Sequence, residues 1–368
     1  MFKSKITAVS TALCLACGFA FAEDAEIAFS NKLSSNIVDI IKEGDADSKS
    51  EFSGIKNKTV FEFASEKLDA GIELVFWSKK IKNSEDDKDL LAIGASSIDS
   101  EGYGFDFGDT FVEVRPFDFL GFEFHEKMWT SGSYFPIWDD NVSTGNIGSD
   151  FGAVIRQIEG LTVGAGLDFA SIFGHSDAKP VVNFGAEYTN DVFALGAAVR
   201  NVADNTFKEA NEKDGIAFGV YGSFLKVEGL VINAGYGYNT SIDPDVTRVG
   251  GSEVSGNLLT STGTYEMDAF HAAYEFATNL VSSKEKVYDF YIAATAGYNV
   301  IEPLSLDLTF ATALDAESDS EKKVDNRFQV KPHATYTIGN HKLSAGVNFF
   351  FGKDFSRIDF PVYWKYSF

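Results

Sequence analysis

The sequence predicts an all-β protein, a transmembrane antiparallel β-barrel of about 16–18 strands. Three observations lead to this prediction. Segments of alternating apolar and polar residues recur along the chain, tight turns and long polar connections alternate between them, and the last segment carries aromatic residues at alternate positions. Successive side chains of a strand point to opposite faces of a sheet, so each segment would present one face to lipid and one to a more polar interior.

The last twelve residues, Arg357–Phe368, show the clearest alternation. They resemble the C-terminal signature of bacterial outer-membrane β-barrel proteins, and this resemblance implies a location in the cell outer membrane, in contact with outer-membrane lipid. It also implies that Trp364, Tyr366 and Phe368 are recognised by the barrel-assembly machinery. The edge strand of a soluble β-sandwich is the alternative that this segment alone leaves open. The apolar positions of the segment are Ile358, Phe360, Val362, Trp364, Tyr366 and Phe368.

The N-terminal residues have the features of a secretory signal peptide. Lys3 and Lys5 precede an apolar run that ends in Ala20-Phe21-Ala22, a typical cleavage site. We therefore expect residues 1–22 to be a signal peptide and residues 23–368 to form a single transmembrane β-barrel domain. Both cysteines, Cys14 and Cys17, lie inside the signal, so the mature chain would contain no disulfide. Lipidation at Cys17 is the alternative.

The chain is strongly acidic, with 31 basic and 54 acidic residues and a net charge of −23. Removal of residues 1–22 takes away two lysines and no acidic residue, so the net charge becomes −25. Nucleic acid is therefore not expected as a partner. Beyond the signal, no apolar run of about 18 residues predicts a helical membrane span. A membrane location would then require a closed barrel, because only helices and closed barrels satisfy all backbone hydrogen bonds in lipid.

The alternating segments give an expected count of eighteen strands. The first segment and the segment at 252–260 are weak, so sixteen is the competing count. The expected strands are 25–32, 58–66, 69–79, 101–115, 119–128, 149–157, 161–171, 180–189, 191–200, 214–226, 230–240, 252–260, 265–278, 287–300, 303–314, 325–338, 341–352 and 356–368.

The connections fall into two alternating classes. Tight ones occur at 67–69, 115–118, 158–160, 189–191, 226–229, 301–303 and 339–340. Long polar ones occur at 33–57, 80–100, 129–148, 171–179, 201–214, 241–251 and 315–325. This asymmetry is typical of the short periplasmic turns and longer outer loops of membrane barrels, with both chain ends on the periplasmic side.

A barrel of sixteen to eighteen strands leaves an aqueous channel, whereas eight strands would fill the interior with side chains. The sequence therefore predicts a channel for passive diffusion of small hydrophilic solutes or ions. Acidic residues outnumber basic ones on the expected lumen face, which favours a weak cation preference. That face would carry Glu62, Glu73, Asp106, Glu113, Glu123, Asp168, Glu187, Glu275, Asp289, Asp307 and Asp359, with Arg156, Arg200, Arg327, Lys331, Arg357 and Lys365.

The connection from Trp129 to Gly148 carries too much apolar surface to remain in water. It follows the fifth expected strand, the position at which general porins fold a loop inward as a constriction. By this resemblance, the constriction would contain Trp129, Tyr134, Phe135 and Trp138, with Asp139 and Asp140 facing the basic Arg156. The alternative is a loop that covers the barrel mouth or contacts a neighbouring protomer of a homo-oligomer.

Two other functions remain open from the sequence. An importer of hydrophobic compounds, resembling the long-chain fatty acid transporters, would need a plug, and the cluster Ile37-Val38-Asp39-Ile40-Ile41 could supply one. An adhesin or structural surface protein would need only exposed loops. The five histidines lie in no G-x-S-x-G or H-E-x-x-H motif, and no metal-ligand spacing is present. We therefore expect no enzyme activity and no catalytic, cofactor or metal site.

Overall fold

The computed structural model describes residues 26–43, 48–51, 54–78, 103–124, 130–135, 140–146, 151–168, 181–200, 217–239, 256–279, 290–314, 326–352 and 355–368. Every regular element in these ranges is a β-strand. Within them, no helix of the length and apolarity required to cross a membrane is present.

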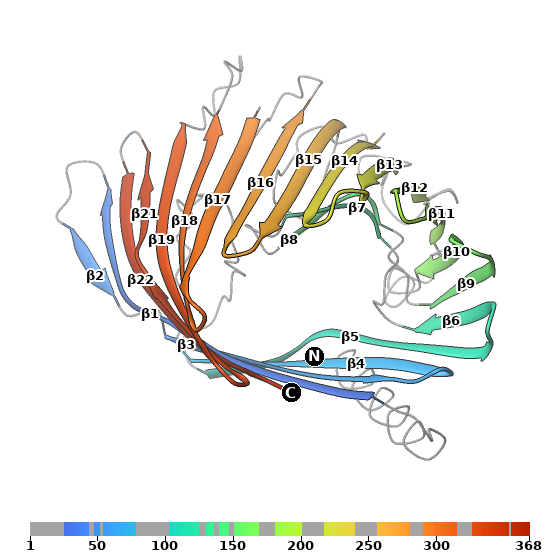
Figure 1. Ribbon diagram of the computed structural model, residues 1–368, viewed down its shortest axis with the longest axis horizontal. Helices are drawn as coiled ribbons and strands as arrows, with labels where there is room; N and C mark the ends of the chain where they lie inside the picture. Colours follow the sequence, from blue (N-terminus) through green and yellow to red (C-terminus); the bar gives the residue numbers. More distant parts are fainter. Residues whose placement is uncertain are drawn as a thin grey trace, which may run out of the picture.

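The strands form a closed antiparallel ring (Figure 1). The first strand, β1 (Glu26–Glu43), pairs with β3 (Ile55–Ala64) on one side and with β22 (Phe355–Ser367) on the other. From β3 the order runs through neighbouring strands to β19, which reaches β22 through β20 and β21, two halves of one interrupted strand. The closed barrel therefore has eighteen strands, and the count of eighteen is confirmed over sixteen.

The remaining barrel strands follow the ring in chain order. They are β4 (Leu68–Ser78), β5 (Tyr103–Phe117), β6 (Leu120–Phe124), β9 (Phe151–Ile158), β10 (Leu161–Asp168), β11 (Val181–Thr189), β12 (Phe193–Arg200), β13 (Ala217–Phe224), β14 (Leu230–Asn239), β15 (Gly256–Met267), β16 (Phe270–Asn279), β17 (Phe290–Ile301), β18 (Leu304–Leu314), β19 (Arg327–Ile338), β20 (His341–Gly346) and β21 (Asn348–Phe351). The short strand β2 (Lys49–Glu51) pairs with β1 in the same register as β3 and continues that strand after an interruption, whereas β7 (Thr130–Phe135) and β8 (Asp140–Asn146) form a separate two-stranded sheet.

The first and last strands seal the barrel through Phe29 and Phe368. The backbone N–H of Phe29 donates to the carbonyl of Phe368 at 2.9 Å, and the N–H of Phe368 donates back at 3.0 Å. The Phe29 ring also contacts the rings of Phe61, Tyr366 and Phe368, with centroids 5.0–6.2 Å apart. Aromatic pairs at these separations add stability beyond their buried area. The alternating aromatic residues of the last strand thus form part of the closure.

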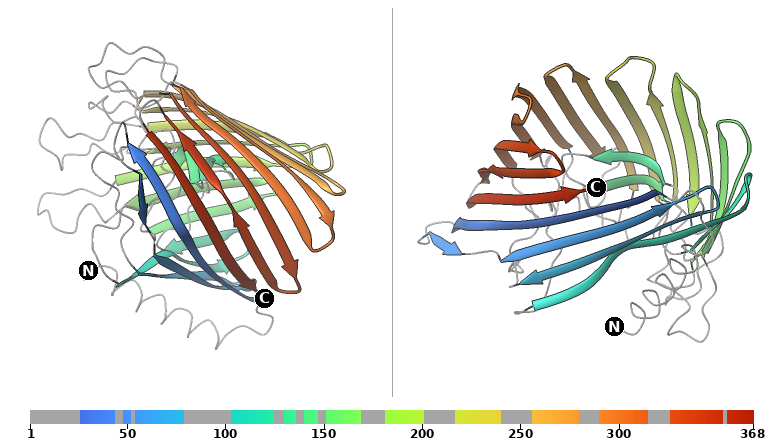
Figure 2. Two further views of the ribbon diagram at one scale, coloured as in Figure 1. Left: turned by 90° about the vertical axis from the view of Figure 1, so that its left-hand side faces the viewer. Right: turned by 60° about the horizontal axis from the view of Figure 1, so that its bottom comes forward.

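Tight turns gather at one end of the barrel, here called the turn end, where Phe368 also lies (Figure 2). They join β3 to β4, β5 to β6, β9 to β10, β11 to β12, β13 to β14, β15 to β16, β17 to β18 and β19 to β20. At Gly160 and Gly229 the φ angles are +75° and +73°, and a Cβ there would overlap a carbonyl oxygen of the next hairpin. Only glycine fits such positions without strain.

The two faces of the wall differ as the alternation predicts, since cross-strand partners share a face. In β18 the outward residues Leu306, Leu308 and Phe310 are 48%, 54% and 44% exposed, whereas Asp307 and Thr309 point inward. Three consecutive half-exposed apolar side chains are unfavourable in water and suit contact with hydrocarbon.

One expected loop is wrong. Residues 33–57 do not form a long connection, because β1 continues to Glu43 and its second half, Asp39–Glu43, pairs with β22 on one side and partly with β2 on the other. A register shift between Asn36 and Asp39 changes which residues face the lumen, so simple alternation is lost beyond this point. Ile40 pairs with Ile358 in the barrel wall. The cluster at Ile37–Ile41 is therefore part of the wall and not a plug, which removes the observation that favoured an importer.

One expected turn is also misplaced. The sequence suggested strands at 252–260 and 265–278, but β15 runs to Met267 and the chain turns at Asp268, whose φ is +50°. The residues Ser261–Thr264 look like a turn because they are small and polar, yet they lie mid-strand. The ring of Tyr274 lies over Gly263, where a Cβ would overlap it. Small residues here make room for a neighbouring aromatic ring and do not mark a turn.

Candidate functional site: the barrel lumen

The segment between β6 and β9 contains a hairpin inside the ring (Figure 1). Its strands β7 and β8 pair with each other, with Tyr134 opposite Asn141 and Phe135 opposite Asp140. The hairpin lies against β12, β13, β14 and β15, which are separated from β6 and β9 by two or more strands of the wall. Trp129, Trp138 and Asp139 lie outside the described residues. The backbone of β7 and β8 therefore lies inside the ring, against the wall formed by β12–β15.

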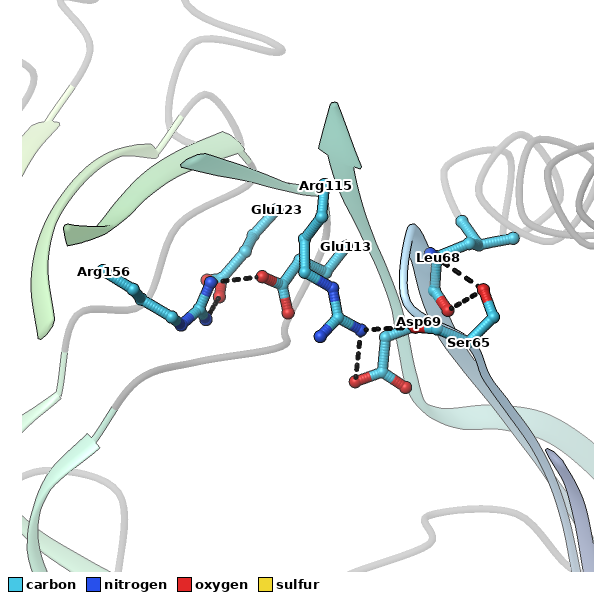
Figure 3. Close-up of polar contacts among 7 residues, drawn as sticks. All are labelled: Ser65, Leu68, Asp69, Glu113, Arg115, Glu123 and Arg156. Atoms are coloured by element: carbon cyan, nitrogen blue, oxygen red, sulfur yellow. Dashed lines mark hydrogen bonds and ion pairs between the residues drawn. The ribbon is translucent and has the colours of Figure 1, made fainter. Parts of the chain in front are cut away.

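Arg156 lies on the lumen face of β9 between two glutamates (Figure 3). Its Nη1 is 2.6 Å from Glu113 Oε1, and its Nη2 is 3.9 Å from Glu123 Oε1. Glu113 and Glu123 are direct cross-strand partners on β5 and β6, so their like charges would repel without the guanidinium. A Cβ at Gly121 would overlap Glu113 Oε1. The glycine therefore provides the space in which Arg156 reaches across β6.

A second arginine continues this charged cluster toward the turn end (Figure 3). Arg115 Nη2 lies 3.6 Å from Asp69 Oδ2 and donates a hydrogen bond of 3.2 Å to the carbonyl of Ser65. Arg115 and Arg156 thus alternate with carboxylates along β4, β5, β6 and β9. We call the residues Asp69, Glu113, Arg115, Glu123 and Arg156 the charged wall cluster. It places fixed charges of both signs beside the water path without a large local excess of either.

A row of four lysines crosses the adjacent sector of the wall, from β20 to β3. Lys342 of β20, Lys365 of β22, Lys32 of β1 and Lys58 of β3 are successive cross-strand partners on the lumen face. We call them the lysine row. Like charges placed directly opposite destabilise a dry sheet, so such a row is favoured only where water screens it. Its presence indicates a hydrated lumen.

Among the described residues, two lysines of the row have a nearby carboxylate or aromatic ring. Lys58 Nζ lies 2.5 Å from Glu73 Oε2. The Lys32 ammonium lies 4.8 Å from the centroid of the Tyr363 ring, within the range of a cation–π contact. Of the row, the sequence identified only Lys365 as a lumen residue. Lys32 and Lys58 flank residues 33–57, which the sequence predicts as a loop. The alternation of Lys58, Val60 and Glu62 nevertheless places Lys58 on the same inward face as Glu62, so this signal could have identified it.

On the remaining wall, polar side chains lie flat over glycines of an intervening strand. His271 Nε2 of β16 is 2.5 Å from Asp307 Oδ1 of β18, across Gly297 of β17. The Tyr221 hydroxyl similarly donates to the Glu187 carboxylate across Gly196. A Cβ on either glycine would overlap these side chains. The absence of a side chain on the middle strand lets its neighbours cross it and keeps these polar side chains close to the wall.

A third charged group lies where β1 meets β22. Arg357 Nε is 2.5 Å from Asp359 Oδ1, and its Nη2 is 3.7 Å from Asp39 Oδ2. Both carboxylates are buried, with Asp39 5% and Asp359 2% exposed. Asp39 escaped the sequence prediction because it lies in the stretch mistaken for a loop. The arginine holds the two carboxylates together across the seam of the barrel.

Register places most of the sequence-predicted lumen residues on one common face. Asp106, Asp168, Arg200 and Arg327 lie in strands whose backbone alone is described there, and Asp289 lies outside the described residues. Among the described residues, no group of three or more His, Cys, Asp or Glu side chains could hold a metal ion. The predicted lumen residues whose side chains are described all lie on this common face, and they are Glu62, Glu73, Glu113, Glu123, Glu187, Glu275, Asp307, Asp359, Arg156, Lys331, Arg357 and Lys365.

No protein-family model matches the sequence, and no curated protein matches it. Several solved structures share the architecture. OccK8 (OprE) of Pseudomonas aeruginosa is 9% identical, with 95% of this chain and 99% of that chain covered and a TM-score of 0.56. OccAB1 of Acinetobacter baumannii is 11% identical, with 95% and 97% covered and a TM-score of 0.55. A BenF-like porin from Pseudomonas fluorescens Pf-5 is 10% identical, with 95% and 99% covered and a TM-score of 0.55. The chain therefore has the closed eighteen-stranded barrel fold of outer-membrane porins.

Proposed function

We propose that the chain is an outer-membrane channel for passive diffusion of small hydrophilic solutes or ions, with a weak cation preference. The observation that carries this proposal is the closed ring of eighteen strands around a lumen face that is rich in charged and small residues. Smaller barrels fill their interior with side chains, whereas this strand number leaves room for water. Residues 1–22 act in this proposal as a signal peptide, and residues 23–368 form the barrel.

The hairpin β7–β8 is the proposed constriction. Its backbone lies within the ring and against β12–β15, so it narrows the path for a solute. In this proposal, the aromatic residues Trp129, Tyr134, Phe135 and Trp138 supply its bulk. Asp139 and Asp140 supply negative charge near the narrowest point, and Arg156 contributes positive charge from the wall.

The proposed ion preference is weak because the lumen carries opposing charges. The charged wall cluster is nearly balanced, since its three carboxylates face two arginines. The lysine row adds positive charge on the adjacent sector. The net charge of −25 that remains without residues 1–22 nevertheless gives the channel a negative field, screened over about 10 Å at 0.1 M salt. Cations are therefore favoured slightly, and the preference fades as salt rises.

Reconstitution into planar lipid bilayers tests this proposal. We expect stable open-channel conductance and, in a KCl gradient, a small reversal potential of cation-selective sign that shrinks at higher salt. An anion-selective sign contradicts the proposed preference. The lack of any conductance steps, despite insertion of heat-modifiable protein, contradicts the channel itself.

The lysine row allows a sharper test of the electrostatics. Replacing Lys32, Lys342 and Lys365 together by glutamine removes positive charge from the lumen, so the reversal potential should move further toward cation selectivity. Lys67→Gln serves as the control, because Lys67 lies in the β3–β4 turn and contacts the exposed Asp118 at 2.8 Å. It removes a positive charge outside the lumen. Equal shifts in both variants would show that the row does not line the ion path.

The aromatic residues at the end of β22 are the basis of a second proposal. We propose that Trp364, Tyr366 and Phe368 form the signature that the barrel-assembly machinery binds during insertion. The rings of Tyr366 and Phe368 lie 6.0 Å apart on the outward face, and Trp364 Nε1 donates to His341 Nδ1 at 3.2 Å. These residues therefore present a continuous aromatic edge on the face that meets lipid.

A further inference from the structure

The membrane-facing wall contains a trough of about 570 Å³ beside the seam of the barrel. One side of it is a row of large residues that are successive cross-strand partners: Leu304, Tyr336, Leu343, Trp364 and Leu33. This row crosses β18, β19, β20, β22 and β1. Tyr336 and Leu343 are 42% and 48% exposed, so their side chains stand away from the sheet. They form a ridge along the outer face of the wall.

The row beside this ridge is made mainly of small residues. Ala334, Ala345, Val362, Ser35 and Ile55 are also successive partners, displaced by two residues along each strand. They lie on the same face as the ridge because side chains two apart on a strand share a face. Alanine and serine at three of these five positions leave the floor low beside tall neighbours. The trough thus results from a row of large side chains that lies next to a row of mainly small ones.

Several polar side chains at the trough are already hydrogen-bonded within the wall. Ser35 Oγ donates to the carbonyl of Gly54 at 2.7 Å, and Trp364 Nε1 donates to His341 Nδ1 at 3.2 Å. Ser344 Oγ accepts from Thr335 Oγ1 at 3.2 Å. Few hydrogen-bonding groups are therefore offered to an occupant. An apolar chain fits this lining better than a sugar, an ion or a polar peptide.

The direction of the trough matches that of a lipid chain. It crosses six strands from β18 to β3, and neighbouring strands lie about 4.8 Å apart, so its length is about 24 Å. Membrane strands tilt by roughly 45°, so a path across them covers about 17 Å of membrane depth. One leaflet of the hydrocarbon core is about 15 Å thick. The trough therefore spans about one leaflet.

The trough begins at the turn end of the barrel. Leu304 is the first residue of β18 after its turn, and Leu343 follows the β19–β20 turn closely. Ile55, at the other extremity, is the first residue of β3 and lies far from the β3–β4 turn. The path thus runs from the turn-end interface into the bilayer interior. Because short turns lie on the periplasmic side of such barrels, the matching leaflet is the periplasmic one.

We propose that this trough binds one acyl chain of a phospholipid from the periplasmic leaflet. The wall around it faces hydrocarbon, so lipid reaches the site without leaving the membrane. The chain lies along the ridge of Tyr336, Leu343 and Trp364, and over the floor of Ala334 and Ala345. Binding rests on packing, since transfer from bulk lipid to the trough involves no change in exposure to water.

Native mass spectrometry of the full barrel, purified in mild detergent with added phosphatidylethanolamine, tests the proposal. We expect one retained phospholipid per wild-type barrel. Ala345→Trp fills the floor and should lower the retained lipid by about tenfold, equivalent to ~1.4 kcal/mol. Ala296→Trp places the same bulk on the outward face of β17, at a similar distance from a turn, and should retain lipid as the wild type does.

Three results overturn the proposal: equal lipid retention in Ala345→Trp and wild type, equal loss in both tryptophan variants, or a wild-type dimer that Ala345→Trp converts to a monomer. The dimer would identify the trough as an interface between copies of this chain. If Ala345→Trp does not give a heat-modifiable barrel, the variant Ala334→Leu, which fills a neighbouring floor position, is tested in its place. Channel conductance should be unchanged in every variant, because the trough lies outside the lumen.

Discussion

Replacement of Arg156 by methionine is the most direct perturbation of the charged wall cluster. Methionine keeps much of the side-chain length and apolar stem but removes the charge that separates Glu113 from Glu123. Glu113 then loses its 2.6 Å partner, and two carboxylates are left as direct cross-strand neighbours. We expect the variant to be clearly less stable than the wild type.

The size of the effect follows from burial. Removing one partner of a fully buried ion pair costs about 3–5 kcal/mol, because a buried charge is left uncompensated. The Glu113 side chain is only 2% exposed, but that of Arg156 is 36% exposed, so water screens part of the interaction. We therefore expect a loss of about 2–3 kcal/mol in the free energy of unfolding.

The assay is urea unfolding of the barrel in lipid vesicles, followed by tryptophan fluorescence and by electrophoresis without boiling. A double-mutant cycle identifies the cause. Adding Glu113→Gln to Arg156→Met should recover about half of the lost stability, since one of the two neighbouring carboxylate charges is then removed. Arg156→Lys, which keeps a single point charge, should fall between the wild type and Arg156→Met. Wild-type stability of Arg156→Met, or further destabilisation by Glu113→Gln, would refute this reasoning.

Three other predictions concern the wall, the seal and the turns. Gly297→Ala should destabilise the barrel by about 1–3 kcal/mol in the same unfolding assay, because its Cβ overlaps the His271–Asp307 contact. Phe368→Asp should greatly reduce the amount of heat-modifiable barrel in outer-membrane fractions, because a charge replaces an aromatic ring in the seal. The Lys67 ammonium lowers the pKa of Asp118, and Asp118 in turn raises the pKa of Lys67, so this pair contributes fully between about pH 3.9 and about pH 10.4 and its contribution is lost only outside that range. The difference in unfolding between Lys67→Gln and wild type should therefore be the same at pH 5 and pH 8.

Each of these predictions has a matched comparison. Gly222→Ala adds the same methyl group where the nearest neighbour is the flexible end of Leu195, at 3.2 Å, and should cost much less than Gly297→Ala. Phe368→Tyr keeps the ring and should insert normally. Equal effects of Gly222→Ala and Gly297→Ala, or normal surface levels of Phe368→Asp, contradict the explanations given. If the difference in stability between Lys67→Gln and wild type changes between pH 5 and pH 8, the explanation given for the Lys67–Asp118 pair is wrong.

Much of the architecture could be predicted from period-two alternation, because lipid and water impose opposite requirements on the two faces of each strand. The strand count and the sorting of turns and loops follow from that pattern. Period-two alternation does not predict the strands correctly where it is interrupted. The register shift between Asn36 and Asp39 hides the second half of β1, and small residues around Gly263 look like a turn.

The lumen was harder to predict because it depends on which side chains meet across strands. Arg156 and Glu113 are 43 residues apart, and only the register brings them together. The lysine row likewise joins residues from the two ends of the chain, Lys32 and Lys365. Sequence alternation assigns each residue to a face, but it does not assign its neighbours on that face. The placement of the hairpin β7–β8 against β12–β15 depends on tertiary contacts that no local pattern specifies.

Closure between Phe29 and Phe368 also has a consequence for biogenesis. Until β22 is available, the outer edge of β1 has no partner, and its backbone N–H and C=O groups are open to pairing with other chains. The contact that completes the ring joins residues 339 positions apart, so it is formed late and its loop-closure entropy is high. The polypeptide must therefore remain unfolded and protected from aggregation while it is made and exported. Protection of the β1 edge thus depends on the arrival of the final strand.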